Sequence, residues 1–587
     1  MSNPRDEKSP SVLSGVGLSP GMGLGTAYLV QPRTPGLFPT HIGPEEVSSE
    51  LERLDTALEQ SRQQLDQIRR RFERELGKEH AYIIDAHLLI LKDPALLDQI
   101  RTGVREDLQS PELAVQECSK NWQAVYRALS DPFFQERGSD VQEVLDRVLA
   151  NLSSLGSQEM GNLPREIVLI VPQISLLLLA EYPLDQVRGL IVEHAGVASH
   201  PVIIARSCRI PVVSGIGESA GMIRTGDPVI VDGDSGEVTI RPSAAKVLEY
   251  QRRVERDERQ RREDAEDDSP CVTSDGQRIR LYTNAELEEE VSLGIEAGAE
   301  GIGLFRSEYL FMKIKEGSPS EEDQLTLYRN LLKRSRGKPV TIRTLDLGGE
   351  RHPYFSTLLG DSGSVLGLRG IRFSLKHPDI FREQIRAILR AGVEGDLRIV
   401  LPMVSDVSEV LRSREQIEAA REELRREGYS CDRQTKIGIM VEVPAAVVLL
   451  SRLCEHVDFL AVGTNDLTQY LLATGREDDQ VADLFDPLHP AVLHSLDQVA
   501  RVAHEAKCPA VVCGEIASHP LYGFLLVGMG FRQLSMNSVN IGRVKRRMRE
   551  ISSREAAACL QEVLSFATLE EVRTFLESYA GRIEVRP

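Results

Sequence analysis

The feature that most restricts the fold is a regular alternation of two patterns in the second half of the chain. After Cys271, short apolar runs typical of buried strands alternate with longer segments whose apolar residues recur at helical spacing. The strand-like runs are RIRLYTN, AEGIGLFRSE, KPVTIRTLDLGG, LRIVLPMV, KIGIMVEVP, VDFLAVGTND, PAVVCGE and RQLSMNS. About eight strand-then-helix units in one stretch are typical of a (β/α)₈ barrel. Residues 270–587 are therefore predicted to form a TIM barrel.

Residues 45–152 have a purely helical pattern. In the first part, apolar residues follow one another at spacings of three, four and seven, at Val47, Leu51, Leu54, Leu58, Leu65, Ile68, Phe72 and Leu76. This spacing predicts one long amphipathic helix with a charged outer face. Further helices, separated by proline-containing breaks, are expected at residues 81–91, 94–105, 111–129 and 140–152. The segment is therefore predicted to be an all-helical bundle inserted between strand-rich parts of the chain.

Strand-like sequence lies on both sides of this helical insert. Residues 13–30 are rich in glycine and small residues, which is typical of short strands, and strand-like runs return between residues 165 and 240. We expect the two parts to pack together as one discontinuous domain, made of residues 1–44 and 153–242. The highly charged residues 243–269 are predicted to form an exposed helical linker to the barrel, although a surface helix of a neighbouring domain has a similar composition.

The composition of the whole chain limits its partners and its location. A formal net charge of -19 over 587 residues argues against nucleic acid as a partner. No apolar run approaches the roughly 18 to 20 residues that a membrane helix needs, and the polar N-terminus lacks the apolar core of a secretory signal. The eight cysteines are scattered without CxxC spacing. We therefore expect neither a zinc site nor a disulfide framework, and we expect a cytoplasmic location.

One histidine stands in a setting that exposes its ring. His200 follows the apolar run 187–192 and a turn of small residues at 195–199, and a short apolar segment comes after it. A strand, a glycine-containing turn and a histidine that opens a helix place an imidazole near backbone N–H groups that can receive an anion. A phosphoryl group carried on that ring is one interpretation. A histidine that begins a helix or packs in a core fits this stretch equally well.

Within the predicted barrel, polar residues stand where strands end, at the edge that carries the active site in TIM barrels. These residues are Arg306, Arg343, Arg369, Glu442, Asn465, Asp466, Arg476 and Cys513. Guanidinium groups match carboxylate and phosphate oxygens, and two carboxylates on adjacent strands suit Mg²⁺ with a substrate phosphate. The cluster favours a small anionic substrate with Mg²⁺, and the alternative is an ordinary ion-pair network. A lone cysteine after an apolar strand is more often a buried residue than a catalytic acid.

Several long motifs in one order connect these residues to a known family. The motifs are DAHLLILKDP, GIGLFRSEYLF, TLDLGG, LGLRGIR, MVEVPAA, GTNDLTQY and CGE. From about Gly15 to nearly its end, the chain resembles enzyme I of the phosphoenolpyruvate-dependent sugar phosphotransferase system, a phosphoenolpyruvate-protein phosphotransferase. The resemblance implies a multidomain α/β protein, with a swivelling phosphohistidine domain that holds an all-helical bundle insert, followed by a C-terminal TIM barrel.

The resemblance also implies a role for each candidate residue. His200 would accept the phosphoryl group of phosphoenolpyruvate, and Cys513 would protonate the enolate carbon to give pyruvate. The substrate would be held by Arg306, Arg343, Arg369, Asn465 and Arg476. Glu442 and Asp466 would bind Mg²⁺. Residues 45–152 would bind the phosphocarrier protein HPr, which passes the phosphoryl group on for sugar uptake, and the barrel would form a homodimer.

The sequence departs from the family pattern around His200. The family's Gly-Gly-x-Thr-Ser-His is AGVASH here, at residues 195–200, and Leu179 stands near the place of a threonine that hydrogen-bonds the histidine. Loss of an orienting hydrogen bond would alter the reactivity of the ring. Two other interpretations stay open. One is a regulatory, nitrogen-type enzyme I paralogue, and the other is a relative of pyruvate phosphate dikinase or phosphoenolpyruvate synthase without the ATP-binding domain.

Overall fold

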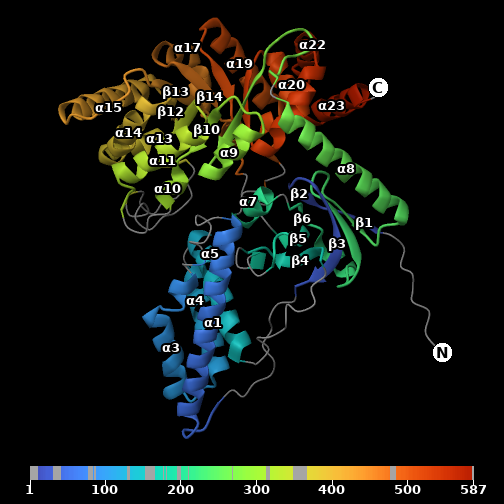
Figure 1. The fold of residues 1–587 in the computed structure, drawn as a ribbon, viewed down its shortest axis with the longest axis vertical. Helices are drawn as coiled ribbons and strands as arrows, with labels where there is room; N and C mark the ends of the chain where they lie inside the picture. Colours follow the sequence, from blue (N-terminus) through green and yellow to red (C-terminus); the bar gives the residue numbers. More distant parts are fainter. Residues whose placement is uncertain are drawn as a thin grey trace. The chain divides into compact units, whose positions relative to one another are not determined.

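The computed structural model describes residues 11–30, 41–76, 84, 87–128, 132–152, 165–175, 178–179, 182–194, 200–208, 210–267, 269–312, 317–347, 358, 366–475, 481 and 484–584. The chain divides into two compact units, Met1–Asp257 and Glu258–Pro587, whose helices and strands are labelled in Figure 1. The first unit is built on an eight-stranded sheet and the second on a closed barrel. This mixed α/β architecture confirms the predicted fold class.

The sheet of the first unit combines strands from both sides of the helical segment. Its strands are β1 (Ser11–Ser14), β2 (Val16–Ser19), β3 (Met22–Leu29), β4 (Ile167–Gln173), β5 (Val187–His194), β6 (Val212–Ser214), β7 (Pro228–Asp232) and β8 (Glu237–Ile240). They lie in the order β1-β8-β7-β3-β4-β5-β6-β2, and β3 to β6 are mutually parallel. Thr26 of β3 pairs with Ile167 of β4. The N-terminal strands therefore share one sheet with strands that follow the helices in sequence.

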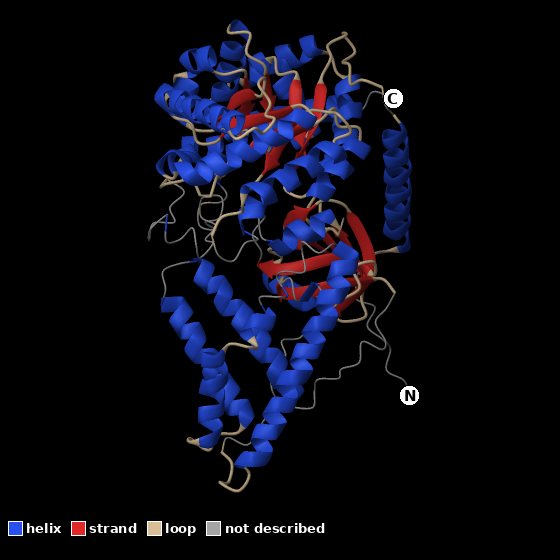
Figure 2. Cartoon of the chain, turned by 60° about the vertical axis from the view of Figure 1, so that its left-hand side comes forward, coloured by secondary structure: helices blue, strands red, loops and turns tan. Residues whose placement is uncertain are grey.

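The helical segment contains long amphipathic helices. They are α1 (Val47–Leu76), α3 (Pro94–Arg105), α4 (Pro111–Ala128) and α5 (Pro132–Leu152), drawn in blue in Figure 2. α3 begins after Asp93, whose carboxylate accepts hydrogen bonds from the backbone N–H groups of Ala95 and Leu96 at 2.9 and 3.2 Å. The expected start of the last helix at residue 140 was wrong. α5 begins at Pro132 because proline suits the first helical turn, and one glycine inside a helix costs only about 1 kcal/mol.

Two further helices belong to the region of His200 and the charged linker. α7 (His200–Ser207) begins at the candidate histidine, whereas the preceding turn at 195–199 lies outside the described residues. α8 (Ala244–Glu266) is the predicted charged helix. It is held to its own sheet, because the Tyr250 hydroxyl accepts a hydrogen bond from the Leu24 backbone N–H at 3.1 Å and Arg253 lies 3.1 Å from Asp232. This half of the helix is therefore not a free linker.

The second unit contains a closed barrel of parallel strands, as the alternating pattern predicted. The strands are β9 (Arg280–Ala285), β10 (Ile302–Arg306), β11 (Val340–Arg343), β12 (Leu397–Leu401), β13 (Lys436–Val441), β14 (Phe459–Val462), β15 (Ala510–Val512) and β16 (Gln533–Met536). β16 pairs with β9, which closes the barrel. Every strand-like run identified in this half of the sequence contributes one strand.

Helices connect and surround these strands. The longer ones are α9 (Glu288–Glu296), α11 (Glu321–Arg334), α14 (Pro378–Ala391), α15 (Val407–Arg426), α18 (Thr464–Leu472), α19 (Pro490–Glu505), α20 (Pro520–Met529), α21 (Ile541–Glu550), α22 (Ser553–Val563) and α23 (Leu569–Glu584). Shorter ones are α10 (Glu308–Met312), α13 (Gly370–Lys376), α16 (Pro444–Val448) and α17 (Leu450–Leu453). Among the described residues, none of the helices is both long and apolar enough to cross a membrane.

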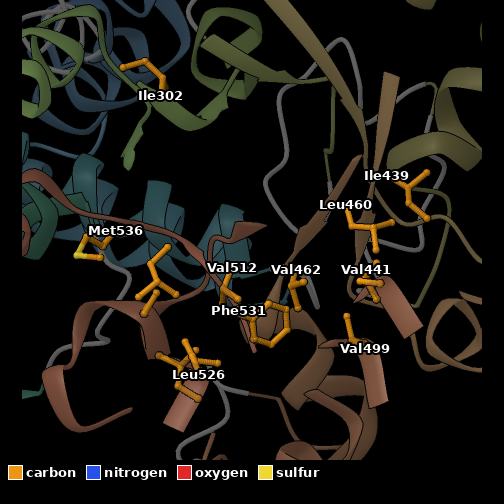
Figure 3. Close-up of a cluster of buried hydrophobic side chains, with 14 of the residues drawn as sticks. Ile302, Ile439, Val441, Leu460, Val462, Val499, Val512, Leu526, Phe531 and Met536 are labelled. Carbon is orange, nitrogen blue, oxygen red and sulfur yellow. The ribbon is translucent and has the colours of Figure 1, made fainter. Parts of the chain in front are cut away.

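Side chains alternate between two cores along each barrel strand. On β12, Leu397 and Ile399 belong to the large buried cluster that packs under the helices, whereas Val400 belongs to a small cluster inside the barrel. Figure 3 shows part of the large cluster, with Val462 and Val512 contributed by neighbouring strands. This alternation determines which residues face the barrel axis. The apolar side chains fill the two cores along the strands, and the polar candidate residues lie where the strands end.

Candidate active site

The predicted polar residues lie at the carboxyl ends of the barrel strands. Arg306 is the last residue of β10, and it pairs in register with Arg343, the last residue of β11. Glu442 directly follows β13, and Cys513 directly follows β15. Because all strands of the barrel run parallel, these positions gather at one mouth.

Asp346 holds two of the arginines in place. The Arg369 Nε and Nη2 groups donate to the two carboxylate oxygens of Asp346 at 3.0 and 2.8 Å, and Arg343 Nη1 lies 3.2 Å from Asp346 Oδ2. The Asp346 side chain is fully buried. Burial acts to raise the pKa of Asp346, but Arg369 and Arg343 outweigh it and lower the pKa overall. Asp346 is therefore a fixed anion between two fixed cations.

Glu308 supports the same arrangement from α10. Its Oε1 accepts hydrogen bonds from Arg343 Nε at 3.1 Å and from the Asp346 backbone N–H at 3.0 Å. Its Oε2 is buried and accepts no hydrogen bond from any residue that the structure describes. Burial raises the pKa of the Glu308 carboxyl, and Arg343 acts in the opposite direction. Arg306 is paired with Glu286 in the same region.

Three carboxylates meet at one point of this mouth. Asp346, Glu442 and Asp466 each offer an oxygen, and these oxygens all lie within 4.8 Å of one another. Glu442 Oε1 accepts a hydrogen bond from the Met403 backbone N–H at 2.7 Å. Burial, together with the charges of Asp466 and Asp346, raises the pKa of Glu442 to about 8. Such a group suits a hard divalent cation, which would replace the proton and relieve the repulsion.

The backbone around Glu442 is adapted to this crowding. Met403 has a φ of 60°, a left-handed conformation that is unusual for a residue other than glycine. This conformation aims the Met403 N–H at Glu442. On the other side, a Cβ atom at Gly463 would lie 2.7 Å from Glu442 Oε2. Because Gly463 has no side chain, the Glu442 carboxylate can occupy this space.

Cys513 is buried beside the cluster. Its Sγ lies 3.8 Å from the carbonyl oxygen of Gly303, and its own carbonyl accepts a hydrogen bond from Asn284 Nδ2 at 2.8 Å. Asn284 in turn accepts a hydrogen bond from the Ser535 hydroxyl at 2.6 Å. Burial raises the pKa of the Cys513 thiol to about 12, with Arg306 acting in the opposite direction. The thiol is therefore protonated at neutral pH, which suits a proton donor.

The structure brings most of the predicted site residues together. Arg343, Arg369, Glu442 and Asp466 form one cluster, and Arg369 Nη2 lies 3.6 Å from Asp466 Oδ2. The Asn465 amide oxygen accepts a hydrogen bond from the backbone N–H of Glu515 at 3.2 Å. Arg476 lies outside the described residues, as do residues 195–199 and the side chain of His200.

Sequence reasoning missed the supporting residues Asp346, Glu308, Asn284 and Ser535. A signal was present for two of them, because Asp346 lies in TLDLGG three residues after Arg343, and Glu308 lies in GIGLFRSEYLF two residues after Arg306. Asn284 and Ser535 carry no such signal, since their hydrogen bonds join strands at opposite ends of the barrel sequence.

Comparison with known proteins covers nearly the whole chain. The family described as PEP-utilising enzyme, PEP-binding domain, matches residues 260–553. The N-terminal and mobile domains of PEP-utilising enzymes match residues 14–137 and 163–236. These three matches follow one another in the order of the chain.

Curated relatives agree with these matches. Phosphoenolpyruvate-protein phosphotransferase from Geobacillus stearothermophilus is 33% identical over 578 residues, covering 98% of this chain and 99% of the relative. The protein of that name from Cupriavidus necator is 34% identical, covering 97% of this chain and 100% of the relative. A solution structure of Enzyme I (nEIt) is 31% identical over 42% of this chain and 99% of its own, with a TM-score of 0.37.

Proposed function

This chain belongs to the phosphoenolpyruvate-protein phosphotransferase family, and from that premise we propose how its residues carry the reaction. His200 accepts the phosphoryl group of phosphoenolpyruvate, pyruvate leaves, and the phosphoryl group passes to a phosphocarrier protein. The observation that carries the proposal is the cluster of arginines and carboxylates at the C-terminal mouth of the barrel, which is built for a small multiply charged anion.

The arginines are the proposed substrate-binding groups. Arg343 and Arg369 are held by Asp346 before any substrate arrives, so little side-chain entropy remains to be lost on binding. Arg306 and Asn465 are proposed to complete the anion site, together with Arg476 as the family resemblance implies. Fixed guanidinium groups neutralise charge on phosphoryl oxygens, which is the main demand of phosphoryl transfer.

The carboxylates fit a resident Mg²⁺. We propose Glu442 and Asp466 as its ligands, and Asp346 is close enough to contribute a third oxygen. The raised pKa of Glu442, caused by burial and by its acidic neighbours, is the observation of this structure that favours a cation there. Bound Mg²⁺ would supply positive charge to the phosphoryl oxygens of the substrate.

The chemistry divides between a nucleophile and an acid. A neutral imidazole of His200 attacks phosphorus, the P–O bond to the enol oxygen breaks, and an N–P bond forms. The enolate then takes the proton of the Cys513 thiol at its methylene carbon, which gives pyruvate and leaves a thiolate to be reprotonated from water. The high pKa of Cys513 keeps that proton in place until the enolate forms.

The remaining assignments are proposed on the family resemblance and the domain matches. Residues 1–44 and 153–242 form the phosphohistidine domain, residues 45–152 bind an HPr-type carrier, and residues 243–269 connect them to the barrel at 270–587. The chain acts in the cytoplasm as a homodimer formed through the barrel. The sugar-transport branch is preferred to a regulatory nitrogen-type role and to a dikinase relative, because the curated relatives are named phosphoenolpyruvate-protein phosphotransferases.

Labelling with radioactive phosphoenolpyruvate tests the proposal. With Mg²⁺ present, wild-type protein should gain acid-labile, base-stable phosphate, and chelation with EDTA should abolish it. His200→Ala should prevent labelling, whereas His504→Ala, at an exposed histidine of α19, should leave it intact. Persistent labelling of the His200→Ala protein would remove the assignment of the acceptor. Addition of an HPr-type carrier should transfer the label from the wild-type protein.

A further inference from the structure

The opposite, N-terminal mouth of the barrel has an unusually polar lining. Leu281 of β9 belongs to the outer core under the helices, whereas Tyr282 belongs to the inner cluster, so Arg280 faces the barrel axis like Tyr282. The same alternation on β12 turns Arg398 inward with Val400. At this end of the barrel, the first side chains that face the axis on β9 and β12 are therefore cations.

Other strands repeat this pattern at the same level. Ile437 and Ile439 of β13 face the outer core and Met440 faces the inner one, so Lys436 points toward the axis. Gln533 of β16 precedes the outward-facing Leu534 and also points inward. Interior layers of TIM barrels are normally filled by bulky branched apolar side chains. This layer is polar instead.

The polar layer surrounds a cavity. A space of about 320 Å³ is lined at this mouth by Arg280, Thr341, Arg398, Lys436 and Gln533. Gly303 also lines it and contributes no side chain to fill it, while Phe459 and Val511 form part of an apolar floor. The cavity is thus a charged opening above an apolar base, which is the usual construction of a small-molecule site.

The cations approach the cavity from opposite sides. Arg280 pairs in register with Gln533 across β9 and β16, and Arg398 pairs with Lys436 across β12 and β13. In the closed strand order, the β9–β16 pair and the β12–β13 pair lie half a turn of the barrel apart. A ligand between them would therefore meet positive charge at both ends.

These cations differ in their acidic neighbours. Arg398 is paired with Asp396, and Asp458, which also lines the cavity, lies 3.5 Å from Arg414. Within the part of the chain that the structure describes, Arg280 and Lys436 make no close ion pair, although the charge of Lys436 acts to lower the pKa of Asp396. In a protein with a net charge of -19, three cations around one cavity are a specific arrangement.

We propose that this cavity binds a small organic dianion, with a carboxylate or phosphate group toward each side and an apolar body between them. Guanidinium and ammonium groups recognise both kinds of anion. The cavity belongs to the barrel unit alone, and its floor residue Val511 lies on β15, two positions before Cys513, which directly follows that strand. The proposal does not depend on the proposed phosphoryl transfer, because it uses none of the residues at the other mouth.

Isophthalate is a suitable probe, because it carries two carboxylates at separate (meta) positions of a flat ring, and its neutral diamide is the charge control. Binding to the full-length protein is measured by titration calorimetry. The location is read from the methyl resonances of Val511, which the ring of a bound probe would shift. Lys436→Met removes one cation that lines the cavity, and Lys333→Met removes an exposed lysine of α11 as the matched control.

The expected result is saturable binding of isophthalate with shifted Val511 methyl resonances. Lys436→Met should weaken binding by about tenfold or more, because a hydrogen bond to a charged group is lost. Lys333→Met should leave it unchanged, and the diamide should not bind. Absence of saturable binding, unshifted Val511 resonances, or wild-type affinity in Lys436→Met would each overturn the proposal. None of these outcomes bears on labelling of His200.

Discussion

Replacement of Asp346 by asparagine tests whether the arginines of the proposed active site depend on a buried anion. The substitution keeps the size of the side chain but removes the charge that Arg369 and Arg343 share at 2.8 and 3.2 Å. Side-chain exposure is 9% for Arg369 and 0% for Asp346, so water cannot replace the lost charge. Breaking a buried ion pair by removing one partner costs about 3–5 kcal/mol. We expect the barrel to lose stability of about that size.

The same substitution should slow the reaction. Arg369 and Arg343 lose the anion that orients them, and misplacement of a positioning group by about 1 Å costs on the order of 10²-fold in rate. Stability is measured by urea unfolding followed by circular dichroism, with the transitions of the two units fitted separately. Activity is measured as the initial rate of labelling from phosphoenolpyruvate.

The chain contains a matched control for this experiment. Asp396 accepts from Arg398 Nε and Nη2 at 3.1 and 2.6 Å, in the same two-pronged geometry, but the side chains are 44% and 21% exposed. Asp396→Asn should therefore cost only about 0–1 kcal/mol and leave labelling unchanged. If the two substitutions cost the same, or if Asp346→Asn labels at the wild-type rate, the reasoning from burial is wrong.

Two other predictions concern neighbouring residues. With a pKa of about 12, Cys513 stays a thiol up to high pH, and its thiolate fraction at pH 8 is about a thousandfold below that of an ordinary thiol with a pKa of about 8.5. Peptide mass spectrometry should show that iodoacetamide modifies Cys513 far more slowly than the partly exposed Cys431, and similar rates would contradict this. Gly463→Ala should push Glu442 from its place, since a Cβ would lie 2.7 Å from Glu442 Oε2. Labelling should then require a higher Mg²⁺ concentration, and an unchanged Mg²⁺ dependence would exclude that explanation.

The barrel, and the gathering of polar residues at one of its mouths, could be predicted because both follow from local periodicity. Each strand-like run alternates in the way a strand facing two cores must alternate, and a polar residue directly after such a run lies at the strand's end. Arg343, Glu442 and Cys513 were found in this way, and the register of the parallel strands brings them to one mouth.

The contacts between these residues could not be predicted, because they depend on segments that are distant in sequence. Arg369 meets Asp346 across 23 residues, and Glu442 meets the Met403 backbone across 39. The left-handed conformation of Met403 has no signature in the sequence, since most such positions hold glycine. The start of α5 was missed for a local reason, because Pro132 was taken as a break although proline is favoured in a first helical turn.

The charges at the mouth of the proposed active site couple the binding of a cation to the binding of an anion. Among the described residues, the arginines Arg306, Arg343 and Arg369 face the carboxylates of Glu286, Glu308, Asp346, Glu442 and Asp466. The acids fix the arginines, but they also leave the mouth short of positive charge for an anionic substrate. A divalent cation at the three central carboxylates would add the missing positive charge, so the cation and the anion would strengthen each other's binding by the same factor. On the proposed function, we therefore expect phosphoenolpyruvate to bind more tightly when Mg²⁺ is present, and Mg²⁺ to bind more tightly when phosphoenolpyruvate is present.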